Sequence, residues 1–206
     1  RSFGIAGFEK RLVIKRIRPE LAKDPRFVQL FITEARISVQ LNHPNVVQVY
    51  DLGRVGTAWY MAMEHLHGRD LTRLVKTLRA RDERLPIPVS VAITADLLRG
   101  LHYAHTRPDT DGNLLGLVHR DVSPHNVVIT FDGTAKLVDF GVARLMNTVQ
   151  SETEGVRDGP GGGKYAYMSP EQATAAPFDH RTDIYSAGIV LWELIAGHRL
   201  FQDPDP

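Results

Sequence analysis

Residues 119–126 read His-Arg-Asp-Val-Ser-Pro-His-Asn, and Asp139-Phe140-Gly141 follows them closely in the chain. These stretches supply two carboxylates, Asp121 and Asp139, and the side-chain amide of Asn126. Mg²⁺ takes a few rigidly placed oxygen ligands of this kind while it keeps its waters and the substrate phosphates. The stretch therefore predicts a phosphotransfer centre, in which Asp121 orients or deprotonates an attacking hydroxyl and Asn126 and Asp139 bind the metal.

The segment between the two motifs reads as a β-hairpin. Residues 127–130, Val-Val-Ile-Thr, and residues 135–138, Ala-Lys-Leu-Val, predict two strands, and Asp132-Gly133 predicts a tight turn between them. A hairpin places Asn126 and Asp139 at neighbouring ends of paired strands, where both can reach one metal site. The alternative is a polar turn beside an unrelated Asp-Phe-Gly.

A lysine and a glutamate near the N-terminus predict an ion pair. Residues 11–17 predict a strand that carries Lys15, and Asp24-Pro25 supplies the N-cap and first-turn proline of a following helix. Glu34 interrupts the apolar face of that helix, and a buried carboxylate is costly unless it is paired. Lys15 is the candidate partner, although it can equally be one of several solvated strand cations.

Composition gives broad limits. The chain has 206 residues, 43% hydrophobic and 24% charged, with a net charge of +1 and no cysteine. This balance gives no argument for a nucleic-acid or membrane partner, and it excludes disulfides and zinc–thiolate sites. No apolar run reaches the length of a membrane span. The chain starts at Arg1, so we read it as a piece of a longer protein, and we expect this piece to be cytoplasmic.

The ordered motifs resemble the catalytic domain of bacterial serine/threonine protein kinases, from about Arg11 onwards. The forms of residues 119–126 and 163–172 look like the branch abundant in myxobacteria. The resemblance implies an α+β fold of two lobes: a small β-rich N-lobe, residues 1–66, and a mainly helical C-lobe, residues 67–206. It also implies that the glycine-rich phosphate loop, the first strand and the last helices of such a domain are missing.

The resemblance implies transfer of the ATP γ-phosphate to Ser/Thr hydroxyls of protein substrates in signal transduction. The implied cofactors are ATP and Mg²⁺, and autophosphorylation in trans is a further expectation. The implied catalytic residues are Lys15, Glu34, Asp121, Asn126, Asp139 and Lys164. The residues implied at the nucleotide are Val13, Lys15, Met63, Glu64, Leu66, Asp70 and Val128. Met63 would close the back of the pocket, the Glu64 carbonyl and Leu66 amide would meet the adenine edge, and Asp70 the ribose.

Two later segments have implied roles in regulation and support. Residues 143–163 are polar and glycine-rich, as in an activation segment, and contain the candidate phosphosites Thr148, Ser151 and Thr153. Arg120 would pair with a phosphate there; a plain flexible loop is the alternative. Residues 183–194 are apolar nearly all round and predict a buried helix, whose Asp183 would cap the catalytic-loop backbone.

Two positions depart from the family pattern. Ser123 stands where such kinases carry a lysine that touches the γ-phosphate, and Lys164 stands where they carry a threonine. We interpret this as an exchange of places, in which Lys164 returns the charge. The opposing interpretation is a catalytically impaired ATP-binding pseudokinase that acts as a regulatory binding module. A small-molecule phosphotransferase is disfavoured by Ser169-Pro170-Glu171, a feature of kinases with protein substrates.

Overall fold

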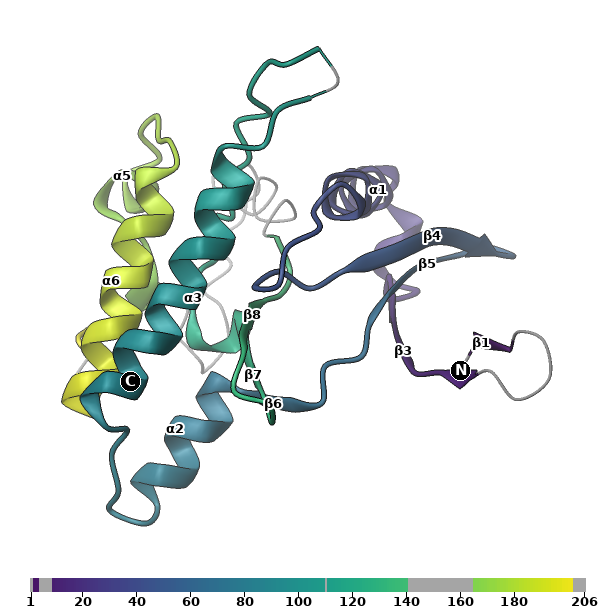
Figure 1. Cartoon of the computed structure of the whole chain (residues 1–206). Coiled ribbons are helices and arrows are strands. Elements are labelled where there is room, and N and C mark those ends of the chain that lie inside the picture. The colour runs from purple at the N-terminus through teal and green to yellow at the C-terminus, as the bar shows by residue number, and fades with distance from the viewer. Residues whose placement is uncertain (1, 4–8, 110, 141–164, 202–206) are drawn as a thin grey trace.

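The computed structural model describes residues 2–3, 9–109, 111–140 and 165–201. Figure 1 shows the strands and helices in two groups, with β6, β7 and β8 between them. At the N-terminus, β1 (Ser2–Phe3) pairs with β2 (Glu9–Lys10) in antiparallel fashion. These two short strands precede the strand expected at residues 11–17, so the expectation that the first strand is missing is wrong.

The N-terminal group is a three-stranded antiparallel sheet covered by one long helix. The strands are β3 (Leu12–Arg16), β4 (Val49–Val55) and β5 (Ala58–Glu64), in the order β3-β5-β4. Helix α1 (Pro25–Val39) follows the short 3₁₀ turn η1 (Leu21–Lys23), and the predicted cap is confirmed, because Asp24 accepts from the Arg26 N–H at 2.9 Å. The buried apolar core here consists of Phe31, Ala35, Val47, Val49, Met61 and Met63.

The turn between β4 and β5 lies later than the sequence indicates. The two glycines of residues 53–56 predict a turn over this segment, but β4 continues to Val55 and Gly53 lies within it, opposite Tyr60. A Cβ at residue 53 would overlap the Tyr60 ring. Gly53 therefore serves close side-chain packing, while Gly56, at φ 57°, makes the turn.

The second sheet contains the predicted hairpin. β7 (Val127–Thr130) pairs with β8 (Ala135–Leu137), which confirms the hairpin, and β6 (Gly68–Asp70) pairs with the other edge of β7. The backbone of β6 passes so close to Ile129 that a Cβ on Gly68 would overlap the Ile129 carbonyl. Helix α2 (Leu71–Arg79) follows β6 directly, and neither element is predicted from the sequence.

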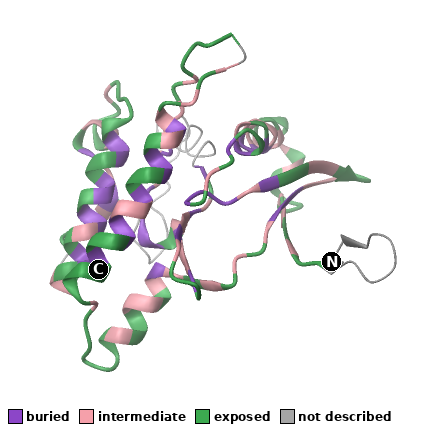
Figure 2. Ribbon diagram, in the orientation of Figure 1, coloured by how far each residue is buried: buried purple, intermediate pink, exposed green. Residues whose placement is uncertain are grey.

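Helices α3 (Ile87–His105) and α6 (Arg181–Ala196) pack side by side in the C-terminal group. The 3₁₀ turn η3 (Tyr165–Tyr167) and the short helix α5 (Pro170–Ala173) precede α6. Figure 2 shows the buried residues of α3 and α6 gathered on their facing sides. This core comprises Leu71, Ile93, Leu97, Leu101, Val122, Val127, Ala135, Leu137, Tyr167, Ala187, Ile189, Val190 and Leu194.

Helix α6 corrects one expectation. The sequence predicts burial nearly all round, yet Ile184, Tyr185, Trp192 and Ile195 are 37–45% exposed. Among the described residues, α3 and η3 are the elements that pack closely on α6, and they leave its opposite side open. An apolar sequence thus gives the capacity for burial, while burial itself depends on the neighbouring elements.

The two groups meet at residues 45–47. The Leu137 N–H donates to the Asn45 carbonyl at 2.9 Å, and the Val47 N–H donates to the Leu137 carbonyl at 2.8 Å. The Asn45 side chain adds a bond from Nδ2 to the Ala135 carbonyl at 2.9 Å. A third apolar cluster, Leu41, Val46, Ala104 and Phe140, lies at this junction. The segment is thereby fixed to β8, the strand that leads to Asp139.

Among the helices that the structure describes, none combines the length and the apolar character needed to cross a membrane.

Candidate functional site

Lys15 connects three predicted site residues. Its Nζ donates to Glu34 Oε1 at 2.6 Å and to Asp139 Oδ1 at 2.8 Å, so the ion pair expected from the sequence is present. Burial acts to lower the pKa of Lys15, but the charges of Asp139 and Glu34 outweigh it, and the pKa lies above its usual value. The lysine is therefore held as a cation between strand, helix and hairpin.

The unfavourable part of this arrangement is the burial of the Glu34 carboxylate. It is buried on α1, and burial raises the pKa of its carboxyl group more than Lys15 lowers it. The distance of 2.6 Å is typical of a charge-assisted bond between an ammonium and a carboxylate. Such a pair contributes position more than stability.

Asp121 and Asn126, the predicted base and a predicted metal ligand, are joined directly. Asn126 Nδ2 donates to the Asp121 carbonyl at 2.8 Å and to Asp121 Oδ2 at 2.9 Å. This fixes the amide nitrogen toward Asp121 and leaves the amide oxygen as the end suited to a cation. The Val138 N–H donates to the Asn126 carbonyl at 3.0 Å, so the hairpin ends carrying Asn126 and Asp139 lie side by side as predicted. The 3₁₀ turn η2 (Pro124–Asn126) leads from the loop into β7.

Two site residues have backbone conformations that are uncommon for side chains with a Cβ. Arg120 has φ 68° and Asp139 has φ 57°. Left-handed backbone of this kind costs free energy and persists where its surroundings enforce it, often at functional sites. Here the enforcing contacts are hydrogen bonds to Asp183 for Arg120 and to Lys15 for Asp139.

Asp183 binds the backbone of residues 119 and 120 through its side chain. Its carboxylate accepts from the backbone N–H groups of His119 and Arg120, each at 2.8 Å, and lies 2.8 Å from His105 Nε2. The side chain is almost fully buried. The predicted cap on the catalytic-loop backbone is thus present. The bond to Asp183 gives the ring of His105 a polar partner inside the fold.

The predicted nucleotide residues lie around the junction of the two groups. Met63 is buried in β5 and stands opposite Val13 of β3, while Leu66 packs beside the same core. Val128 and Asp70 are paired across β7 and β6. The Asp70 carboxylate already caps α2, accepting from the Arg73 N–H at 2.9 Å. A ribose contact would have to share Asp70 with this structural role.

The residues fit a magnesium site that is completed by its ligand. Asn126 and Asp139 offer an amide oxygen and a carboxylate, which are the hard donors that Mg²⁺ takes. In the part of the chain that the structure describes, no group of three or more His, Asp or Glu could hold a metal ion. Two protein ligands with waters and phosphates suit Mg²⁺, which is rarely held by an all-protein cage.

Several expected residues lie outside the described ranges, namely Gly141, Thr148, Ser151, Thr153 and Lys164. The exchange of places between Ser123 and Lys164 therefore stays a prediction. Ser123 itself is buried, and its carbonyl accepts from the Asn126 N–H at 2.9 Å.

Sequence reasoning missed Lys136 on β8. Its Nζ forms an ion pair with Glu64 at 2.9 Å. In sequence Lys136 looks like an ordinary polar residue of a half-buried strand, and only the meeting of the two sheets gives it a partner.

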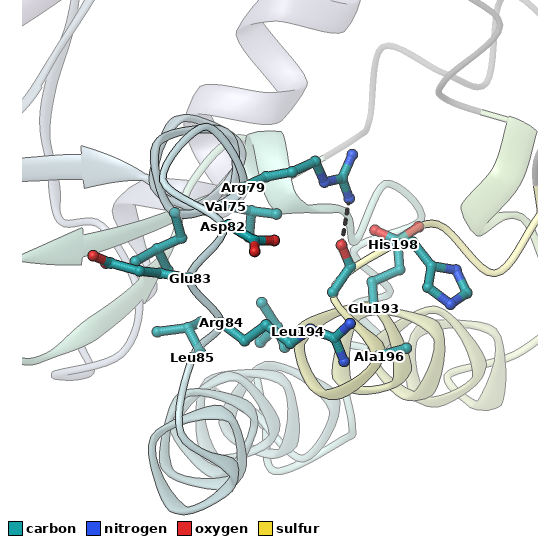
Figure 3. Close-up of a pocket in the computed structure, with 12 residues that line it drawn as sticks. Val75, Arg79, Asp82, Glu83, Arg84, Leu85, Glu193, Leu194, Ala196 and His198 are labelled. Carbon is teal, nitrogen blue, oxygen red and sulfur yellow. Dashed lines mark hydrogen bonds between the residues drawn. The ribbon is translucent and has the colours of Figure 1, made fainter.

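A hollow of about 280 Å³ lies away from these residues (Figure 3). Residues of α2, the loop after it and the C-terminal end of α6 line it, and Arg79 donates to the Gly197 carbonyl across it at 2.8 Å. None of the predicted catalytic or nucleotide residues lines this hollow, so its size alone does not make it the active site.

Comparisons with known proteins agree with this geometry. A family model described as the protein kinase domain matches residues 6–206. The chain is 39% identical over 198 residues to tyrosine-protein kinase MasK of Myxococcus xanthus, and 35% identical over 201 residues to serine/threonine-protein kinase PknB of Mycobacterium leprae. These alignments cover 96% and 95% of this chain but 30% of each relative.

A solved structure confirms the two-lobed α+β fold. The kinase domain of Mycobacterium tuberculosis PknI aligns with a TM-score of 0.70 and 28% identity, covering 98% of this chain and 71% of that chain. The exact boundary between the lobes, placed at residues 66 and 67 from the sequence, stays a prediction.

Proposed function

Since this chain belongs to the protein kinase domain family, we propose that it is the catalytic part of an enzyme that transfers the γ-phosphate of ATP to serine or threonine hydroxyls of proteins. One observation carries the proposal: Lys15 binds Glu34 and Asp139 at once, at 2.6 and 2.8 Å. This contact brings a strand lysine, a helix glutamate and a hairpin aspartate, distant in the sequence, to one point.

Each residue of the site has its own role in the proposed phosphoryl transfer. Lys15, fixed by Glu34, offers a positive charge to phosphate oxygens. Asn126 and Asp139 offer oxygens to Mg²⁺, and ATP bound with the metal supplies the phosphoryl group. Asp121, oriented through its bonds from Asn126, accepts the proton of the attacking hydroxyl or aligns it.

The acceptor type rests on the relatives. Several of them are named serine/threonine-protein kinases, and Pro124 in the catalytic loop looks unlike the tyrosine-specific form. MasK, however, is named a tyrosine-protein kinase, and this observation makes tyrosine phosphorylation the second candidate. The proposal extends to signal transduction, autophosphorylation in trans and a cytoplasmic site of action. Intact Asp121, Asn126 and Asp139 favour it over the pseudokinase.

The test is transfer of radiolabelled γ-phosphate with Mg²⁺ by the full-length protein, beside its Asp121→Asn variant. We expect transfer to a protein mixture in wild type and a loss of at least about a hundredfold in the variant, the lower end of what a positioned base contributes. Asp132→Asn, on the β7–β8 turn, is the control and should keep the activity.

Acid hydrolysis of the labelled products identifies the acceptor. Phosphoserine and phosphothreonine support the proposal, and phosphotyrosine alone would establish the second candidate. No transfer in either protein, with ATP still bound, would indicate the pseudokinase.

A further inference from the structure

Lys136 forms an ion pair between the two halves of the molecule. Its Nζ lies 2.9 Å from Oε2 and 3.1 Å from Oε1 of Glu64. Lys136 belongs to β8, which leads to Asp139, and Glu64 ends β5, where the chain crosses to the second sheet. The two side chains are only 16% and 27% exposed, so water screens this pair less than a surface pair.

The main chain of Glu64 is fixed as well. Its N–H donates to the Gln48 carbonyl at 2.8 Å, and the Gln48 N–H donates to Glu64 Oε2 at 3.3 Å. The Glu64 carboxylate therefore accepts from both Lys136 and Gln48. These bonds restrain Glu64 at its backbone nitrogen and at its side chain, and thereby limit the movement of the adjoining Glu64 carbonyl. This carbonyl is the group expected to meet the adenine edge.

Lys136 also stands in one row with two other predicted nucleotide residues. It is directly opposite Val128 on β7, and Val128 is directly opposite Asp70 on β6. Directly paired residues of an antiparallel sheet present their side chains on the same face. Lys136 is therefore the β8 member of this row, and its side chain binds Glu64.

We propose that Lys136 is a positioning residue for the nucleotide, which fixes Glu64 relative to Val128 and so sets the distance between the two sides of the adenine site. This inference rests on the proposed function, because it takes the ligand to be an adenine nucleotide. Lys136 makes no contact with the nucleotide in this proposal and acts through Glu64.

The first test is the affinity for a non-hydrolysable ATP analogue. Lys136→Met keeps an unbranched side chain of nearly the same length and removes its charge. We expect the Kd of the full-length protein to rise about three- to tenfold, as the loss of one partly buried ion pair gives. The KM for ATP should rise likewise, with kcat at saturating ATP unchanged. Lys136→Arg should restore most of the affinity, and Lys23→Met, an exposed lysine elsewhere in the chain, should have no effect.

The second test needs no nucleotide. Amide hydrogen exchange of the ligand-free protein should be faster at Glu64 in Lys136→Met, because the bond from its N–H to Gln48 loses support. The amide of Val47, which bonds to the β8 backbone, should keep its protection. Faster exchange at both, together with a lower melting temperature, would indicate general loosening and contradict a positioning role.

Other outcomes are equally decisive. Unchanged exchange at Glu64 and unchanged affinity would overturn the proposal. A higher kcat with unchanged affinity would also overturn it, because the pair would then restrain closure of the lobes. If the wild-type protein binds no ATP, the proposed function fails, while exchange at Glu64 still decides whether Lys136 fixes this residue.

Discussion

His119 shows how a single neutral ring shapes the catalytic loop. Its Nδ1 accepts from the Asp121 N–H at 3.3 Å, and its Nε2 lies 3.3 Å from the Val138 carbonyl. Only a neutral imidazole with its proton on Nε2 can make both bonds. Burial lowers the pKa of His119, and the nearby charges of Asp183 and Asp121 only partly oppose this. The ring thus links Asp121 to Val138, the residue before Asp139.

We predict that His119 makes the stability pH-dependent. A histidine whose pKa is lowered on folding binds protons more readily in the unfolded chain, so acid favours unfolding. Its contribution should be complete above the ordinary pKa of 6.5 and should be lost as the pH falls below it. We would measure the free energy of unfolding by urea titration at about pH 7.5 and about pH 5.5. Between these two pH values it should fall less for His119→Gln than for wild type.

The exposed His102 provides the control for this prediction. His102→Gln should retain the full loss of stability in acid. An equal loss in wild type and His119→Gln would show that other groups carry the pH dependence.

At the scale of elements, local chemistry explains what the sequence could predict. The hairpin 127–138 follows from β-branched residues around Asp132-Gly133, and the start of α1 follows from Asp24-Pro25. Strand β6, only three residues long, contains Gly68 and Asp70, which have low strand propensity. It forms because β7 offers an unpaired edge. Such tertiary partners are invisible in a local pattern.

Helix α6 supports the catalytic loop through one side chain, and we predict a measurable effect of altering it. Asp183→Asn keeps one acceptor oxygen and loses the other, so a buried N–H of His119 or Arg120 loses its partner. Leaving one such donor unsatisfied costs about 1–3 kcal/mol. Urea unfolding should show a loss of this size, accompanied by a fall in phosphate transfer.

Asp179→Asn, just before α6 and exposed, serves as the comparison and should change neither quantity. Unaltered stability in Asp183→Asn would mean that the loop N–H groups find other acceptors.

At the scale of the whole molecule, the site lies between two separate apolar cores. The family resemblance implies both lobes, and the isolated charge of Glu34 on an apolar face predicts a cationic partner, for which Lys15 is the candidate. It does not predict the contacts of Lys136 with Glu64 or of Asn45 with Ala135. These depend on how the lobes meet, and neither residue differs in sequence from an ordinary surface or loop residue.

We predict that Asn45 couples the unfolding of the two lobes. Asn45→Ala removes the bond to the Ala135 carbonyl, at a cost of about 1–3 kcal/mol for the buried acceptor. The chain has two tryptophans, Trp59 in β5 and Trp192 in α6, so that fluorescence of the Trp192→Phe and Trp59→Phe proteins reports one lobe each.

In the wild-type background the two probes should change at the same urea concentration. With Asn45→Ala added, the Trp59 signal should change at lower urea than the Trp192 signal. Transitions that still coincide would show that the remaining junction contacts are sufficient.

Lys15 donates to both Glu34 and Asp139. As a result, the binding of an anion at Lys15 and the binding of a cation at Asp139 depend on each other. An anion that draws Lys15 away leaves Asp139 without this cation, and a cation that takes Asp139 leaves Lys15 ready for the anion. Whichever ligand arrives first has to break the Lys15–Asp139 bond, and the second finds it already broken. Binding of the anion and of the cation is therefore cooperative, and the protein binds the two together more tightly than either one alone.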